Sequence, residues 1–184
     1  DLLWLPFVTA HYVTHSGDLS ILYETRPFLM GSPLDSEETE RYGHYQTTAK
    51  AYDLYEHCCR ALERGSTTGP HGLPLMGGGD WNDGMNRVGI NGQGESVWLG
   101  WFLCAALKSF APLCELVGDK ERAARYMETA RQVSEALERY GWDGGWYRRA
   151  YYDDGRPMGS AENIECQIAS TTQSWAVLSG TADP

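Results

Sequence analysis

The sequence lacks an excess of basic residues. Its 184 residues include 15 Lys and Arg against 25 Asp and Glu, so the formal net charge at pH 7 is −10. Nucleic acids and anionic membrane surfaces favour basic proteins. The charge balance therefore argues against both as partners, although a local basic pocket for phosphate stays compatible with it.

The cysteines do not form a recognisable pattern. There are five, an odd number, two of them are adjacent (Cys58 and Cys59), and no C-x-x-C spacing occurs. A disulfide framework or a zinc site would need a different arrangement. We therefore expect free thiols, no metal, and a reducing compartment: the cytoplasm, or the cytoplasmic face of the inner membrane if the chain is part of a larger protein.

A long hydrophobic run is also missing. The longest apolar run, residues 97–107, is shorter than the roughly 20 residues that a transmembrane helix needs. It predicts a buried core helix and no membrane insertion of this segment. No signal peptide is visible, and both ends of the sequence resemble the interior of a folded unit. We expect the 184 residues to be a fragment of one larger domain.

Apolar residues recur at helical spacing over most of the chain. A short β-hairpin is expected within residues 142–155, and residues 31–43 should form a solvated loop. The expected helices cover residues 2–16, a short segment after Asp18 that Pro27 ends, and residues 46–64, 95–117, 119–140 and from 170 onward.

A Gly-Asp pair recurs where one helix should end and the next begin, in HSGDLSIL and LVGDKERA, with an imperfect copy in LSGTADP. Glycine permits the left-handed stop, and aspartate caps the new helix. Antiparallel helix pairs of this kind build α/α barrels and solenoids. No fixed repeat of about 34 to 47 residues supports a scaffold of the TPR or HEAT type. The expected fold is all-α, part of a toroid of helical hairpins.

The chemistry is concentrated in residues 72–94, GLPLMGGGDWNDGMNRVGINGQG. Long irregular loops inside compact domains are often functional. One interpretation is an Asn/Asp turn with local hydrogen bonds. The other is a sugar site, in which Trp81 covers the apolar face of a sugar ring and Asp80, Asn82 and Asp83 take its hydroxyl groups.

A carboxyl group beside an indole is partly desolvated, which raises its pKa and suits a general acid. Asp80 and Asp83 are too close in sequence to flank a glycosidic bond from opposite sides. One catalytic acid and one supporting aspartate fit better. An EF-hand beginning at Asp80 fails, because Gly84, Met85 and Asn91 occupy ligand or turn positions. A phosphate-binding P-loop fails because no G-K-[ST] follows the glycines.

Other residues have two open interpretations. His71 could contact a ligand or belong to a turn, Glu95 could act chemically or favour a helix dipole, and Gln173 could reach a ligand or cap the last helix. An aromatic cluster with two arginines could be a sugar platform or hairpin packing: Trp142, Trp146, Tyr147, Arg148, Arg149, Tyr151 and Tyr152.

The segments GLPLMGGGDWNDGMNRVG and GESVWLGWFL resemble the signature region of glycoside hydrolase family 94. Further segments, DLLWLPFVTAHYV, LYEHCCRAL and GSAENIECQIASTTQSWAVLSG, resemble the same family in the same order, so the resemblance spans nearly the whole chain. It is nearest to the branch of cyclic β-1,2-glucan synthases and β-1,2-oligoglucan phosphorylases. It implies an (α/α)6-barrel catalytic domain, of which residues 1–184 would be roughly the middle half.

The resemblance also implies roles for single residues. The second Asp of D-W-N-D, Asp83, would be the catalytic acid, and Trp81 would line the sugar subsite at the cleaved bond. Asp1 would contact the glucosyl unit. The arginine that usually precedes it, and the phosphate-binding His and Thr expected downstream of Pro184, lie outside this sequence. The fragment alone is therefore expected to be inactive.

The implied reaction is inverting phosphorolysis of β-glucosidic bonds, or its reversal as glycosyl transfer. Inorganic phosphate is the co-substrate, no cofactor or metal is needed, and the partners are a β-glucan oligosaccharide and phosphate, with a homodimer as a further option. Two alternatives stay open: a noncatalytic, glucan-binding or length-controlling segment of a cyclic β-1,2-glucan synthase, and a hydrolase that uses water.

Overall fold

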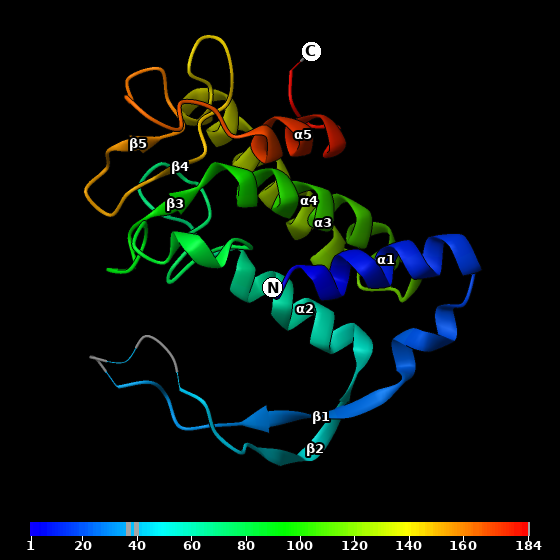
Figure 1. Cartoon of the computed structure of the whole chain (residues 1–184). Coiled ribbons are helices and arrows are strands. Elements are labelled where there is room, and N and C mark those ends of the chain that lie inside the picture. Colours follow the sequence, from blue (N-terminus) through cyan, green and yellow to red (C-terminus); the bar gives the residue numbers. More distant parts are fainter. Residues whose placement is uncertain (36–37, 39–40, 184) are drawn as a thin grey trace.

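The computed structural model describes residues 1–35, 38 and 41–183, except the side chain of Asp83. Helix α3 (Val97–Leu116) runs through the middle of the helical part, and α4 (Lys120–Ala136) packs along it (Figure 1). Helices α1 (Trp4–Ser16) and α5 (Ser170–Leu178) also pack against α3, and α2 (Leu54–Gly65) packs against α1. The largest fully buried side chains are those of Trp101, Phe102 and Phe110, all on α3.

Helix α3 is apolar on nearly every side because it is covered on nearly every side. Among the described residues it alone has the length and composition of a membrane-crossing helix, and 72% of that apolar window is buried inside the protein. The expected core helix over residues 95–117 is thus confirmed, two residues shorter at its start. All five cysteines are free thiols, and Cys166 is the exposed one.

The Gly-Asp turns form as the sequence predicts. Gly17 and Gly118 have left-handed backbone angles (φ 72° and 87°) that a residue with a Cβ atom rarely adopts. The side chain of Asp18 accepts a hydrogen bond from the backbone of Ser20 and begins the 3₁₀ helix η1 (Leu19–Tyr23). Asp119 caps α4 in the same way.

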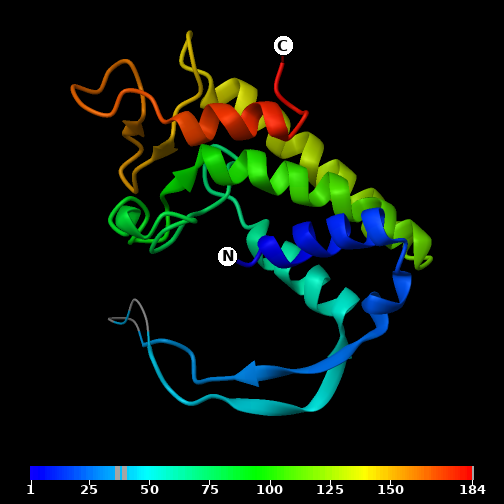
Figure 2. The same ribbon diagram turned by 45° about the vertical axis from the view of Figure 1, so that its right-hand side comes forward.

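The prediction of a helix over residues 46–64 is wrong in its first half. Residues Gln46–Asp53 form strand β2, which pairs antiparallel with β1 (Thr25–Met30), and the helix begins only at Leu54, where Asp53 caps it. Figures 1 and 2 show the β1–β2 ribbon as a separate arm below the helices. The solvated loop expected at residues 31–43 lies partly outside the described residues.

A small three-stranded sheet lies at the N-terminal end of α3. Strand β3 (Glu95–Ser96) pairs with β4 (Ala150–Tyr151), which pairs with β5 (Pro157–Met158). The hairpin expected within residues 142–155 therefore forms a few residues later. A π-helical turn, η3 (Leu137–Gly141), continues α4 toward this hairpin. The fold is mainly helical, and the two small sheets correct the all-α expectation.

Candidate functional site

The segment between α2 and β3, residues 66–94, is the glycine loop. Its one regular element is the 3₁₀ helix η2 (Asp83–Met85), and the side chain of Asn82 caps it by accepting a hydrogen bond from the backbone of Gly84. The loop packs tightly on itself: a Cβ atom on Gly94 would lie 2.5 Å from the carbonyl oxygen of Val88. The glycines thus permit close backbone packing that other residues would prevent.

Asp80 ties the loop to the hairpin. Its fully buried side chain pairs with Arg149 through two contacts, Nη1 to Oδ2 at 2.7 Å and Nη2 to Oδ1 at 2.8 Å. The Ser96 hydroxyl donates to Asp80 Oδ2 at 2.7 Å and also accepts a hydrogen bond from the backbone of Leu99 at the start of α3. The loop is therefore fixed to both the hairpin and the most buried helix.

The pKa of Asp80 lies below its ordinary value. Burial alone would raise the pKa, but the hydrogen bonds and charge of Arg149, with the Ser96 hydroxyl, outweigh it. Asp80 is therefore a carboxylate near neutral pH, which suits a supporting group and not a proton donor.

Asp153 fixes the second half of the loop. Its carboxylate accepts hydrogen bonds from the backbone of Asn91, Gln93 and Gly94, each at 2.9 Å. Burial raises the pKa of Asp153, but these three bonds lower it more, so the net shift is downward. Its own backbone N–H donates to the carbonyl of Val88.

Glu95 fixes the first half. It is 1% exposed, and its Oε1 accepts hydrogen bonds from the backbone of His71 (3.0 Å) and Leu73 (3.1 Å). Its Oε2 lies 2.5 Å from Nδ1 of His71, whose ring stacks on Tyr151. Both residues therefore hold the loop in place. His71 lies in a turn, as one interpretation of the sequence predicts, whereas Glu95 lies in β3 and not at the start of a helix.

Of the predicted sugar-binding residues in the loop, Trp81 and Asn82 are exposed, and the side chain of Asp80 is buried. Trp81 is 57% exposed, with its ring 6.1 Å from that of Trp98. Asp83 begins η2 directly after Asn82, but its side chain lies outside the described part of the chain. Its assignment as the acid stays a prediction.

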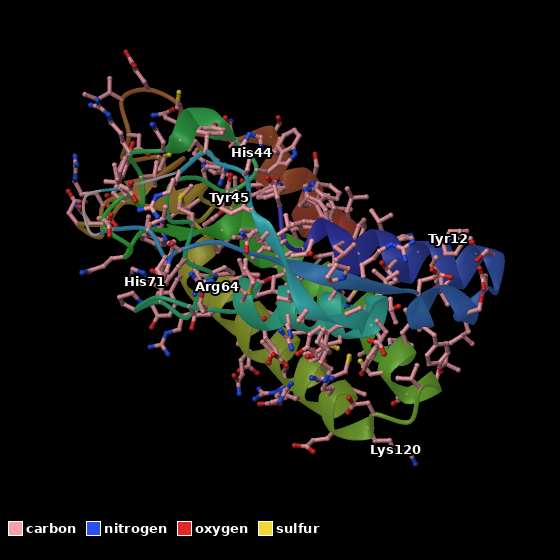
Figure 3. The ribbon with its side chains drawn as sticks, turned by 90° about the horizontal axis from the view of Figure 1, so that it is seen from below. Tyr12, His44, Tyr45, Arg64, His71 and Lys120 are labelled. Atoms are coloured by element: carbon pink, nitrogen blue, oxygen red, sulfur yellow. The ribbon has the colours of Figure 1, made fainter. Side chains whose placement is uncertain are left out.

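A cavity of about 420 Å³ lies between the glycine loop, the end of α2 and the N-terminus. Asp1 and Asp80, 79 positions apart in sequence, both line it, together with Arg64, Gly77 and Gly79. In Figure 3, Arg64 lies near His71, and Tyr12 and Lys120 lie on the other side of the molecule. A further cavity of about 470 Å³, lined by Asp18, Glu24 and His57 among others, contains none of the predicted site residues.

The aromatic cluster of residues 142–152 serves mainly to pack the hairpin. Trp146 donates its Nε1–H to the carbonyls of Gly159 and Gln167, and the Tyr147 hydroxyl contacts Glu138. The side-chain amide of Gln173 bonds both the N–H and the C=O of Tyr147, which favours the structural interpretation.

The sequence analysis did not identify two residues that hold the glycine loop in place. Arg149 was noted only as part of the aromatic cluster, and Asp153 was not singled out. The sequence carries a weak signal for each, an Arg-Arg pair and a D-D-G turn, and neither indicates contact with a loop about 60 to 70 positions away.

Comparison with known proteins shows the family of this chain. The family model described as "Glycosyl hydrolase 94 superfamily, catalytic domain" matches residues 1–184. Cyclic beta-(1,2)-glucan synthase NdvB of Rhizobium meliloti (strain 1021) is 48% identical over 184 residues, which are 100% of this chain and 6% of that protein. Two Paenibacillus borealis enzymes also match.

The first is 3-O-beta-D-glucopyranosyl-beta-D-glucuronide phosphorylase, 40% identical over 149 residues, which cover 80% of this chain and 19% of the enzyme. The second is solabiose phosphorylase, 34% identical over 183 residues, which cover 98% of this chain and 22% of the enzyme. The chain thus spans at most about a fifth of the length of these relatives. Because the family model covers every residue, the chain belongs to the catalytic domain of the glycosyl hydrolase 94 superfamily.

Proposed function

We propose that this chain carries the catalytic acid of an inverting glycoside phosphorylase or glycosyltransferase. The substrates are β-1,2-glucan-type oligosaccharides and inorganic phosphate, and the acid is Asp83. Family membership supports carbohydrate chemistry, and the names of the relatives support both phosphorolysis and β-1,2-glucan as a substrate class.

The observation that carries the proposal is the way the D-W-N-D segment is held. Asp80 is buried and paired on one side of Trp81, and the cap of η2 lies on the other, so an exposed indole stands on a fixed backbone. An exposed tryptophan on an ordered loop suits the apolar face of a sugar ring. Asp1 lines the same cavity as Asp80, and we assign to it a contact with a sugar hydroxyl.

In the proposed reaction, Asp83 protonates the glycosidic oxygen as the bond breaks through an oxocarbenium-like state. Phosphate attacks the anomeric carbon from the opposite face and inverts it. Phosphate is already anionic, so no carboxylate base is needed to activate water. In the reverse direction, Asp83 accepts the proton of the acceptor hydroxyl. Asp80 supports the loop, and the amide nitrogen of Asn82 is available to a sugar hydroxyl, because the amide oxygen caps η2.

The proposal also covers the complete domain to which these residues belong. The α3–α4 pair, flanked by α1 and α5, suits part of an (α/α)6 barrel completed by chain outside these residues. Isolated residues 1–184 would then be inactive. The protein acts in the cytoplasm without a cofactor, and a homodimer is compatible with it.

Product analysis tests the reaction. The full-length protein is incubated with β-1,2-glucooligosaccharides with and without phosphate. Sugar 1-phosphate that appears only with phosphate supports the proposal. Free glucose in both samples would identify a hydrolase, and binding without turnover would identify a noncatalytic glucan-binding segment. Either result would contradict phosphorolysis.

A further inference from the structure

Arg149 links the D-W-N-D segment to the hairpin through Asp80. It is 6% exposed, and it meets both oxygens of Asp80 across 69 positions of sequence. Asp80 Oδ1 also accepts a hydrogen bond from the backbone of Asn82 at 3.0 Å. The contact between hairpin and loop therefore reaches the residue that lies between Trp81 and Asp83.

Ser96 contacts both Arg149 and Asp80. Arg149 Nη1 donates to the Ser96 hydroxyl at 3.1 Å, and that hydroxyl caps the first turn of α3. The guanidinium group also lies over the ring of Trp98, 5.8 Å from its centroid. Arg149 thus connects the loop to the N-terminal end of α3, the most buried helix.

We propose that Arg149 is a positioning residue for the reaction. Through Asp80 it fixes the backbone from which Trp81 and Asp83 project, and it does not itself touch the sugar. This inference rests on the proposed function, because it assigns to Arg149 a part in the same reaction. Reaction rates are sensitive to displacements of about 1 Å in catalytic groups, so a loosened Asp80 should lower kcat more than it changes KM.

The planar fork of arginine is essential to this role. Two parallel N–H···O bonds fix both the distance and the orientation of a carboxylate, whereas lysine supplies one point charge. If Arg149 only neutralised the buried charge of Asp80, lysine would replace it. If it orients the loop, lysine would keep the charge and still lose the rate.

The chain offers a matched control in the neighbouring residue. Arg148 lies in the same segment, but its side chain contacts the carbonyls of Tyr140 and Trp142, the Tyr151 hydroxyl and the carboxylate of Asp143. None of these residues belongs to the glycine loop. Arg148→Lys therefore makes the same chemical change in the same segment at a side chain that does not contact Asp80.

The experiment compares Arg149→Lys, Arg148→Lys and the unaltered full-length protein in phosphorolysis. We expect kcat to fall by about tenfold or more in Arg149→Lys, with KM for the oligosaccharide within about threefold. Arg148→Lys should keep kcat within about twofold of the unaltered value. Because Arg149 acts through Asp80, Asp80→Asn combined with Arg149→Gln should lower kcat no further than Asp80→Asn alone. An Arg149→Lys variant with unaltered kcat would overturn the assignment, as would additive effects in the double variant.

Hydrogen exchange separates this inference from the proposed function. Amides of residues 80–86 should exchange faster in Arg149→Lys than in Arg148→Lys or the unaltered protein, whether or not the protein proves to be a phosphorylase. Absence of phosphorolysis in the unaltered protein would remove the proposed function, and the exchange rates would still decide whether Arg149 positions the loop. Equal exchange in all three proteins would overturn the inference.

Discussion

At Asp80, burial and ion pairing act on the same carboxyl group in opposite directions. Burial raises its pKa, the guanidinium group of Arg149 lowers it, and the net shift is downward. An aspartate whose pKa is lower in the folded protein stabilises the fold above its unfolded pKa of about 3.9. That stabilisation is lost as the pH falls through the folded pKa. Asp80 thus stays charged under conditions in which a general acid must carry a proton.

Trp81 should matter for binding and little for folding, because 57% of the residue is exposed. Trp81→Ala should weaken oligosaccharide affinity about tenfold, or roughly 1.4 kcal/mol, since it removes an apolar wall from the sugar face. Isothermal titration of the full-length protein measures this. Trp142, 44% exposed on the hairpin, supplies the control: Trp142→Ala should bind normally, and equal affinity in all three proteins would show that the Trp81 indole does not contact sugar.

Glu95 should matter for local stability. Glu95→Ala leaves the buried backbone N–H groups of His71 and Leu73 without their acceptor and separates the His71 pair. A buried donor left without its acceptor costs about 1–3 kcal/mol. Hydrogen exchange of these two amides should therefore accelerate strongly. The exposed residue Glu128, paired with Arg131 on α4, is the comparison, and similar exchange in Glu95→Ala and Glu128→Ala would refute the anchoring role.

The sequence singles out the D-W-N-D motif as a candidate site but does not single out the residues that support it. Asp80, Trp81, Asn82 and Asp83 stand together in one motif, so composition and spacing are enough to select them. The contact of Asp80 with Arg149 is a tertiary one, and no local pattern encodes which of two adjacent arginines turns toward the loop. The structure was needed to separate Arg149 from Arg148.

Among the elements, the turn between β4 and β5 controls the far half of the glycine loop. The pKa of Asp153 is lowered, so its bonds to the amides of Asn91, Gln93 and Gly94 are present above the unfolded pKa of about 3.9 and are lost as the pH falls through the lower folded value. These three amides should be protected at pH 7 and lose that protection in strong acid.

The Asp153→Asn variant tests this dependence. It removes the charge, so the amides of Asn91, Gln93 and Gly94 should already be less protected at pH 7, and their protection should no longer change with acid. Hydrogen exchange corrected for the intrinsic effect of pH gives the comparison. Asp154→Asn is the matched control, because Asp154 pairs with Arg156 outside the loop. Protection that is identical in the two variants would contradict the role of Asp153.

Helices were predicted well where caps and apolar period coincide. Helix α4 begins directly after its predicted cap, Asp119. Helix α5 begins at Ser170 as expected, although no side chain caps it. Strand β2 was missed because Ala51 and Tyr52 continue the helical spacing of α2 backward from Tyr55. The residues of β2 form a strand because they pair with β1, in a register that joins Thr25 to Asp53 and Met30 to Gln46. Such nonlocal pairing overrides a short periodic pattern.

At the scale of the whole molecule, the exposed apolar faces agree with a fold that continues beyond these residues. Leu5, Val8 and Tyr12 lie on one exposed face of α1, and Val177 and Leu178 are exposed on α5. In the proposed barrel, neighbouring helices cover such faces. The relatives are long enough to contain those helices, since this chain spans between 6% and 22% of their length.

The proposed reaction depends on the side chain of Asp83. The kinetics of Asp83→Asn in the full-length protein test this dependence. Phosphorolysis should fall about 100- to 10,000-fold, the usual contribution of a general acid, while oligosaccharide affinity stays within about twofold because the amide keeps the shape of the carboxyl group. Turnover within tenfold of the unaltered protein would contradict the proposal, because no other group has been assigned to protonate the departing oxygen.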